Sequence, residues 1–348
     1  MFPAIPPHEA HLRERALAKK TFTRLYLALF LFLIFVNGLL LALQLFMISY
    51  LGEDSAYEIF SSPYFAYSVQ VLFMYVLGFP FFLLLCQGLP RAVYEKKSLG
   101  LGSLIIYFMI CWFIMTAGAS LSTTISTFIY TFLPGGGTDS GVIDGIANGV
   151  PLWLSILLFV VLAPIFEELM FRKLLIDRMS VFGDGCAIAV SAIAFGIFHG
   201  NIEQMIYAAG IGVILGIVYT KTRQVKYTIF LHMAVNFLGS IPSLLINDLS
   251  EELISQGENY DLGLSIALSS ISIITVILQL GLTVAGLVML CVWAAKGKIT
   301  PQKRYIAAIR GGTLAKATVF NFGALLFFAF CLFEICYNVY TNVILAIG

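Results

Sequence analysis

The stretch from residue 25 to residue 50 is LYLALFLFLIFVNGLLLALQLFMISY, and it contains no Asp, Glu, Lys or Arg. A helix needs about 20 mostly apolar residues to cross the hydrocarbon core of a bilayer, and this stretch is longer than that. The stretch therefore predicts a membrane-spanning helix. Because it is too long and begins too late to be a cleaved secretory signal, we expect the span to be retained.

The composition extends this conclusion to the rest of the chain. Of the 348 residues 60% are hydrophobic and 11% are charged, whereas soluble domains carry about 25% charged residues. High hydrophobicity also excludes intrinsic disorder, and a net charge of +1 argues against a nucleic-acid partner. We therefore predict an all-α, polytopic membrane protein. Its expected spans, about nine transmembrane helices, are residues 25–50, 64–89, 101–133, 151–170, 185–200, 203–220, 227–247, 263–295 and 318–345.

The positions of the basic residues predict the orientation. All 20 Lys and Arg residues fall in every second loop, and the intervening loops carry only acids. Short loops rich in Lys and Arg stay on the cytoplasmic side. We therefore expect a multi-pass protein of the cell membrane with a cytoplasmic N-terminus and an extracytoplasmic C-terminus.

The same pattern predicts how the chain is organised. The N-terminal tail is interpreted as a solvated segment that sets the topology, in preference to a helix lying on anionic headgroups. Polar residues enter the membrane mainly in one central part of the chain. The predicted parts are a cytoplasmic N-terminal tail (1–24), three leading transmembrane helices (25–133), an extracytoplasmic loop (134–150), a core (151–247) and two C-terminal transmembrane helices with connecting loops (248–348).

Ionisable residues inside spans are costly and mark functional sites by default. Each one alone is more often a helix–helix hydrogen bond or a surface ion pair, but several at one depth favour a site. Those in the core occupy or directly follow three of its four apolar segments, 151–170, 185–200 and 227–247. The candidate site residues are Glu167, Glu168, Arg172, His199, His232 and Asn236.

Helix geometry predicts that these residues converge. Residues four apart share a helix face, as do Glu168 with Arg172 and His232 with Asn236. Glu167 and His199 each lie sixteen residues from Gly183, so an antiparallel hairpin turning there sets them at one height. We expect the cluster to open toward the cytoplasm. The hairpin tip is expected to project into the cytosol with its charged residues Asp177, Arg178 and Asp184.

Such a cluster permits two kinds of chemistry. A carboxylate beside an imidazole can deprotonate a water molecule, and a second imidazole with an amide can stabilise an oxyanion. Two histidines and one carboxylate also form a catalytic zinc set, here Glu167, His199 and His232. The sequence lacks the HExxH spacing of many zinc proteases. No cofactor is therefore certain, and a divalent metal such as zinc stays the alternative.

At these residues the sequence resembles the CPBP family of intramembrane proteases, which includes the eukaryotic CAAX prenyl endopeptidase and bacterial Abi proteins. The motifs EExxxR, FxxxH and HxxxN begin here at Glu167, Phe195 and His232, in that order. The resemblance covers about residues 151–247. It implies that Glu167 and His199 activate water, that His232 and Asn236 stabilise the oxyanion, and that Glu168 and Arg172 support the site.

The resemblance and the residues together predict an intramembrane endopeptidase. Its expected partners are the lipid bilayer and a peptide or membrane-anchored protein substrate, such as a bacteriocin or pheromone leader or a lipidated peptide. The alternative is a non-catalytic membrane scaffold or bacteriocin-immunity protein that binds a membrane sensor or a toxin. A secondary transporter is disfavoured because we find no inverted repeat.

Overall fold

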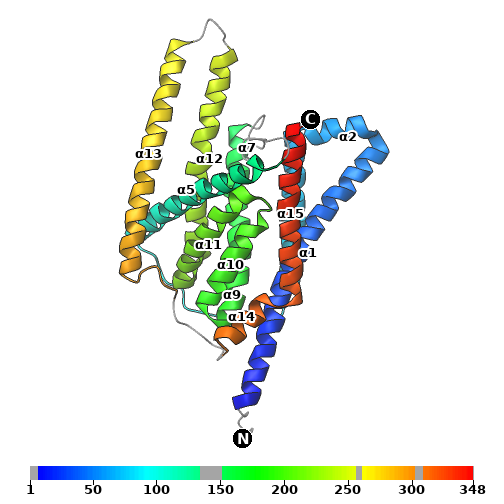
Figure 1. Ribbon diagram of the computed structural model, residues 1–348, viewed down its shortest axis with the longest axis vertical. Helices are drawn as coiled ribbons and strands as arrows, with labels where there is room; N and C mark the ends of the chain where they lie inside the picture. Colours follow the sequence, from blue (N-terminus) through cyan, green and yellow to red (C-terminus); the bar gives the residue numbers. More distant parts are fainter. Residues whose placement is uncertain (1–6, 134–150, 256–260, 302–308, 348) are drawn as a thin grey trace. The chain divides into compact units, whose positions relative to one another are not determined.

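The computed structural model describes residues 7–133, 151–255, 261–301 and 309–347 (Figure 1). These ranges contain helices and no strand, so the predicted all-α polytopic class is confirmed. The predicted outer loop 134–150 lies outside the described residues. The elements are α1 (Pro7–Leu51), α2 (Glu53–Ser61), α3 (Pro63–Gln70), η1 (Val71–Gly78), α4 (Phe79–Leu85), α5 (Leu101–Thr131), α7 (Leu152–Ser155), η2 (Ile156–Leu162), α8 (Ala163–Glu167), η3 (Glu168–Ile176), α9 (Asp177–Met179), η4 (Ser180–Phe182), α10 (Asp184–Phe198), α11 (Ile202–Thr222), α12 (Val225–Ser255), α13 (Leu262–Ala295), α14 (Gly311–Val319) and α15 (Phe322–Ile347).

Eight helices in the described ranges are long and apolar enough to cross a membrane. The fifth predicted span, residues 185–200, is not among these eight. It corresponds to α10, which has only 15 residues and is short for a full crossing. The predicted span 151–170 is also longer than expected, because the helix runs from Leu152 to Phe182. Glu167 and Glu168 therefore lie within a helix and do not end one.

The chain divides into two compact units. Unit 1 comprises Met1–Val93, Lys173–Val190 and Lys303–Tyr340, and unit 2 comprises Tyr94–Arg172, Ser191–Gln302 and Thr341–Gly348.

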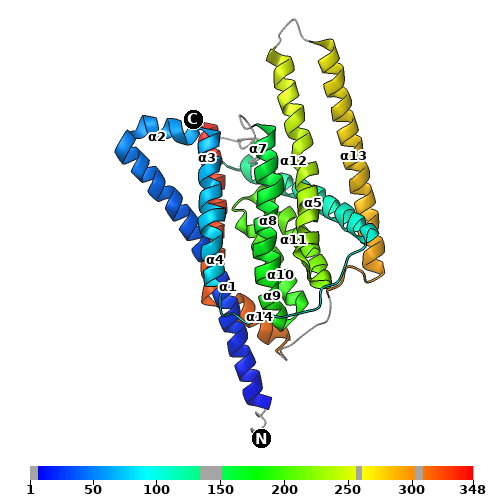
Figure 2. The same ribbon diagram turned by 180° about the vertical axis from the view of Figure 1, so that it is seen from behind.

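Helix α1 is the central helix of unit 1 and packs against α2, α4 and α14. It begins at Pro7, so most of the predicted tail is helical and continuous with the first span. Figure 2 shows α4 lying against α1. Aromatic rings join α1 to its neighbours: Phe22 to Phe182 at 5.6 Å, Tyr26 to Phe327 at 5.9 Å and Phe35 to Phe81 at 4.6 Å between centroids.

The hairpin tip at Gly183 is buried in unit 1, so the prediction that it projects into the cytosol was wrong. Asp177 and Asp184 are 4% and 0% exposed, and Arg178 donates to the carbonyl of Cys86 at 3.2 Å. The charges are neutralised locally, since Asp177 pairs with Lys173 at 2.8 Å. Apolar neighbours in the tip are fully buried as well. Helix-length arithmetic sets the height of a tip but does not reveal what packs around it.

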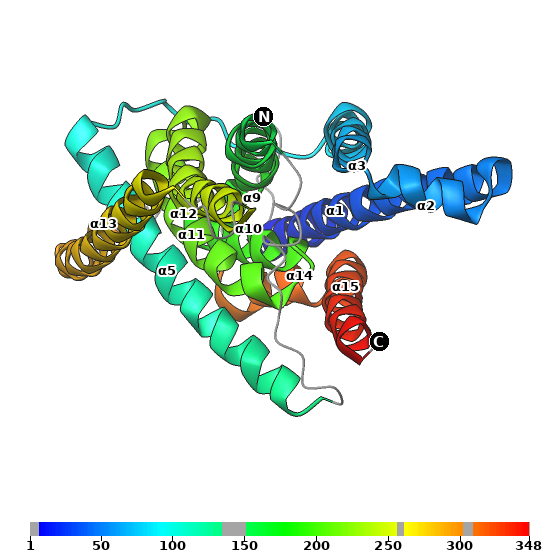
Figure 3. The same ribbon diagram turned by 90° about the horizontal axis from the view of Figure 1, so that it is seen from above.

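In unit 2, helix α5 lies across α11, α12 and α13 (Figure 3). Trp112 on α5 donates to the carbonyl of Gln279 on α13 at 3.0 Å, and Tyr107 packs edge-on against Trp293. Helices α10 and α11 approach closely because a Cβ on Gly196 would lie 2.5 Å from the carbonyl oxygen of Met205. This close contact places the end of α10 beside the start of α11.

Candidate active site

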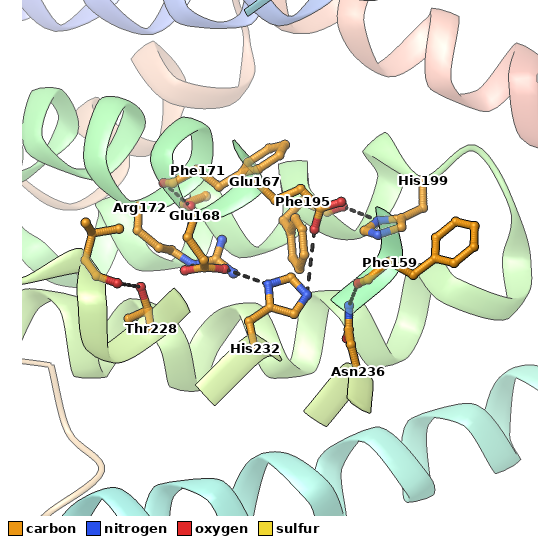
Figure 4. Close-up of polar contacts among 12 residues, drawn as sticks. Phe159, Glu167, Glu168, Phe171, Arg172, Phe195, His199, Thr228, His232 and Asn236 are labelled. Carbon is orange, nitrogen blue, oxygen red and sulfur yellow. Dashed lines mark hydrogen bonds and ion pairs between the residues drawn. The ribbon is translucent and has the colours of Figure 1, made fainter. Parts of the chain in front are cut away.

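Glu167 and Glu168 both face His232. Nδ1 of His232 lies 3.1 Å from Oε1 of Glu168, and its Nε2 lies 3.7 Å from Oε2 of Glu167. Figure 4 shows the imidazole between the two carboxylates. Consecutive residues of an α-helix do not share a face. Here, however, the π-helix η3 begins at Glu168, and its wider turn brings neighbouring side chains closer in direction. Single-turn π segments are frequent at functional sites.

Glu168 also forms a buried ion pair with Arg172. Oε2 of Glu168 lies 3.1 Å from Nε of Arg172, and both side chains are 0% exposed. The guanidinium carbon lies 4.6 Å from the centroid of the Phe195 ring, which gives the cation an aromatic partner. The pairing predicted from the spacing of four residues is therefore present. Its burial explains how the helix continues past two acidic residues.

His199 lies just after the end of α10, held from both sides. Its Nδ1 is 2.8 Å from the carbonyl oxygen of Phe195, and its own carbonyl accepts from the amide of Asn201 at 2.9 Å. Asn201 in turn caps α11 by accepting from the backbone of Gln204. Because a carbonyl oxygen only accepts, Nδ1 of His199 carries the proton. In the neutral ring Nε2 is then a free acceptor.

The predicted partnership of His199 with Glu167 is not a direct contact. Among the described residues the two side chains share no hydrogen bond, although Figure 4 shows the ring of His199 pointing toward the Glu167 side of the cluster. The ring of Phe195 contacts both histidines, at 5.0 Å from His199 and 5.7 Å from His232 between centroids. The predicted activation of water by both residues would require a water molecule that bridges Glu167 and His199.

Asn236 joins the cluster from the same face of α12 as His232. Its amide nitrogen donates to the carbonyl of Phe159 on η2 at 3.0 Å. That bond uses one of two amide hydrogens, so one donor remains. Helix α12 is held against η2 by apolar packing of Val160 against Ile241. This packing sets the height of His232 and Asn236 relative to the two glutamates.

Sequence reasoning missed three contributors to the site. Thr228 is fully buried one helical turn before His232, and its hydroxyl donates to the carbonyl of Val225 at 3.0 Å. The spacing of four from His232 was a usable signal. Phe195 was named only as the first residue of the FxxxH motif and was given no role, although its ring contacts Arg172 and both histidines. Phe159 contributes only its backbone carbonyl, which no side-chain pattern indicates.

Exposure is graded across the cluster. The side chain of Glu167 is 23% exposed, that of His232 is 7% exposed, and those of Glu168 and Arg172 are 0% exposed. Glu167 is thus the reachable carboxylate, and the buried pair lies behind it. This gradient is consistent with a site in which Glu167 contacts a ligand, while the buried side chains behind it fix its orientation.

The segment that contains this cluster matches a known protein family. Residues 149–238 match the family described as "Type II CAAX prenyl endopeptidase Rce1-like". The Rce1-like segment includes all six candidate residues, and the resemblance to the CPBP family predicted from the motifs is confirmed for it.

A curated relative agrees with the Rce1-like match. The chain is 28% identical over 87 residues to the protein named "Putative membrane peptidase YdiL" of Bacillus subtilis (strain 168). The match covers 24% of this chain and 34% of that protein, so the chain spans about a third of the relative's length. No solved structure matches.

The Rce1-like segment does not assemble the alternative zinc set. Among the described residues no group of three His, Cys, Asp or Glu side chains is placed to hold a metal ion. Nδ1 of His232 faces Glu168 and Nδ1 of His199 faces a carbonyl, so each histidine keeps Nε2 as the ring nitrogen that can meet a ligand. Glu167 lies 3.7 Å from Nε2 of His232. Zinc therefore stays a hypothesis, and the arrangement as it stands is suited to proton transfer and hydrogen bonding.

Proposed function

We propose that this chain is an intramembrane endopeptidase that hydrolyses a peptide bond in a membrane-associated or peptide substrate. The observation that carries the proposal is the row of Glu167, His232, Glu168 and Arg172, whose exposure falls from 23% to 0%. A structural ion pair needs only Glu168 and Arg172. A second, reachable carboxylate beside the imidazole is what general-base catalysis requires.

In the proposed mechanism Glu167 removes a proton from a water molecule that also donates to Nε2 of His199. The resulting hydroxide attacks the carbonyl carbon of the scissile bond and forms a tetrahedral oxyanion. Glu167 then transfers the proton to the amine nitrogen as the carbon–nitrogen bond breaks. The products are a carboxyl terminus and an amine, so atoms and protons balance. The scheme needs Glu167 ionised before attack.

The oxyanion is stabilised by donors from α12. Because Nδ1–H of His232 is donated to Glu168, Nε2 donates only when the ring is protonated. Two carboxylates lie beside the ring, at 3.1 and 3.7 Å, and the proposed scheme uses the protonated ring. The second amide hydrogen of Asn236 supplies another donor. Donors fixed in advance cost little reorganisation in the transition state.

The membrane setting defines the substrate class that we propose. The cluster lies within helices long and apolar enough to span a bilayer, so a substrate has to reach it from the membrane or its surface. A peptide with an apolar or lipidated segment meets this requirement because that segment partitions into lipid.

The test is a cleavage assay on the purified full-length protein in lipid nanodiscs. A library of peptides with apolar or lipidated ends is incubated with the protein, and new termini are identified by mass spectrometry. Glu167→Gln keeps the shape but removes the base, and we expect cleavage to fall about 10²-fold or more. Glu251→Gln, at an exposed position on α12, is the matched control and should cleave normally.

Two outcomes contradict the proposal. If the unmutated protein produces no new termini from any peptide, the catalytic assignment fails, and the scaffold or immunity alternative becomes the better hypothesis. If Glu167→Gln cleaves at the unmutated rate, the enzyme is retained but its proposed base is wrong.

A further inference from the structure

Unit 1 contains a basic cavity whose lining includes none of the candidate active-site residues. It has a volume of about 310 Å³ and lies between α1 and α14, which are adjacent in Figure 1. Three of its five lining residues are cations. The lining residues are Arg15, Lys19, Lys316, Ala317 and Phe320.

The positive charges of this cavity have no acidic partner among the described residues. No acidic residue lines the cavity. The nearest acids along α1 are engaged elsewhere: Glu14 accepts from the backbone of Ile309 at 3.0 Å, and Glu9 pairs with Arg13 at 3.9 Å. Arg15 and Lys19 are four residues apart and share a helix face, where like charges repel. Lys316 adds a third charge from α14, so an anion in the cavity would relieve repulsion among all three.

Residue counting from the predicted spans sets the cavity at the depth expected of lipid headgroups. Lys19 precedes the first apolar residue of its span, Leu25, by six residues, and Lys316 precedes Phe322, the first residue of α15, by the same number. At 1.5 Å rise per residue this is about 9 Å along α1, which corresponds to the interfacial layer outside the hydrocarbon core. Phe320 is 78% exposed at the same level, as expected of an aromatic anchor in the interface.

We propose that this cavity binds the phosphate of an anionic phospholipid headgroup. Two long cationic side chains from α1 and one from α14 surround the phosphate, and the acyl chains extend along the apolar surface beside Phe320. The predicted cytoplasmic placement agrees with this ligand, because anionic lipids attract basic segments next to membrane spans. A bound lipid would hold α14 against α1 by bridging charges on both helices. The proposal is independent of the peptidase assignment.

A pair of charge-matched variants tests the proposal in the full-length protein. Arg15→Gln combined with Lys316→Gln removes two cations from the cavity. The control, Arg13→Gln combined with Lys20→Gln, removes two exposed cations of the same helix outside the cavity lining. Each protein is placed in phosphatidylcholine nanodiscs containing a minor fraction of phosphatidylglycerol. Retained phosphatidylglycerol is counted by native mass spectrometry at several lipid fractions.

We expect the cavity variant to bind phosphatidylglycerol about tenfold more weakly than the unmutated protein. The control should lose no more than about twofold, because its two charges lie outside the cavity lining and act on a bound headgroup only through a screened field. Arg15→Lys combined with Lys316→Arg preserves the charge and should retain binding, which separates loss of the site from loss of folding. Equal losses in the cavity and control variants would show a diffuse electrostatic effect and overturn the site.

A second arm distinguishes the lipid from a soluble anion. Inorganic phosphate is titrated into the unmutated protein in nanodiscs with phosphatidylglycerol. Retention of the lipid at millimolar phosphate supports a lipid site, because the acyl chains add affinity that free phosphate lacks. Displacement of the lipid at micromolar phosphate would make the cavity a site for a soluble phosphate and overturn the lipid assignment.

Discussion

The centroid of the Phe195 ring lies 4.6 Å from Cζ of Arg172, so one aromatic side chain covers the buried guanidinium and also contacts both histidines of the site. Arg172 is 0% exposed, its ion-pair partner is Glu168, and this ring covers its guanidinium. Water therefore does not solvate either charge of the ion pair. The pair fixes the position of the Glu168 carboxylate, and this carboxylate in turn accepts a hydrogen bond from His232.

Removing the cation from this pair should destabilise the protein strongly. Arg172→Met leaves Glu168 buried without its charged partner, and breaking a buried pair on one side costs about 3–5 kcal/mol. We expect a lower unfolding temperature in thermal denaturation of the detergent-solubilised protein. The double variant Glu168→Gln with Arg172→Met removes both charges and should recover part of the loss. If the single variant is as stable as the unmutated protein, the pair is not buried as described.

The local part of the site could be predicted from the sequence, and the long-range part could not. The contact of Glu168 with Arg172 follows from a spacing of four residues, which is a property of any helix. The placement of His232 against both glutamates depends on the π-turn that begins at Glu168. No residue period indicates such a turn, because it changes the helix by a single extra residue. The same holds for the bond of Asn236 to the Phe159 carbonyl.

For the fold as well, features set by the local sequence could be predicted, and features set by tertiary packing could not. The spans were predictable because the bilayer dictates a length of about 20 apolar residues. The hairpin tip was predicted wrongly because helix-length arithmetic gives the height of a tip and not its neighbours, and tertiary packing buries residues such as Asp184. The basic residues counted for one cytoplasmic loop include Arg172, which lies inside a helix. The predicted orientation thus rests on the other four groups.

Glu167 and His199 should behave as one catalytic unit. Glu167→Ala and His199→Ala should each abolish peptide cleavage in the nanodisc assay while expression and unfolding temperature stay close to those of the unmutated protein. Residues that share one water molecule give non-additive losses. The double variant should therefore be about as inactive as either single variant. Activity of the double variant near that of the unmutated protein would refute the assignment of both residues.

Chelation should have little effect on cleavage. The described residues contain no three-residue group placed to hold a metal, so we expect activity to survive 1,10-phenanthroline and elemental analysis to find substoichiometric zinc. A control peptidase with a known catalytic zinc, treated alongside, should lose its activity. One zinc per chain, with activity lost on chelation and restored by added zinc, would favour the alternative set of Glu167, His199 and His232.

The predicted orientation can be tested by cysteine labelling in sealed cells. Ser98 and Ser55 are exposed and lie on opposite predicted sides. Cys291 and Cys336 are exposed and must be replaced first. A membrane-impermeant maleimide should modify Ser55→Cys in intact cells, and Ser98→Cys only after permeabilisation. Labelling of Ser98→Cys from outside would reverse the topology, and a substrate would then reach the site from the extracytoplasmic side.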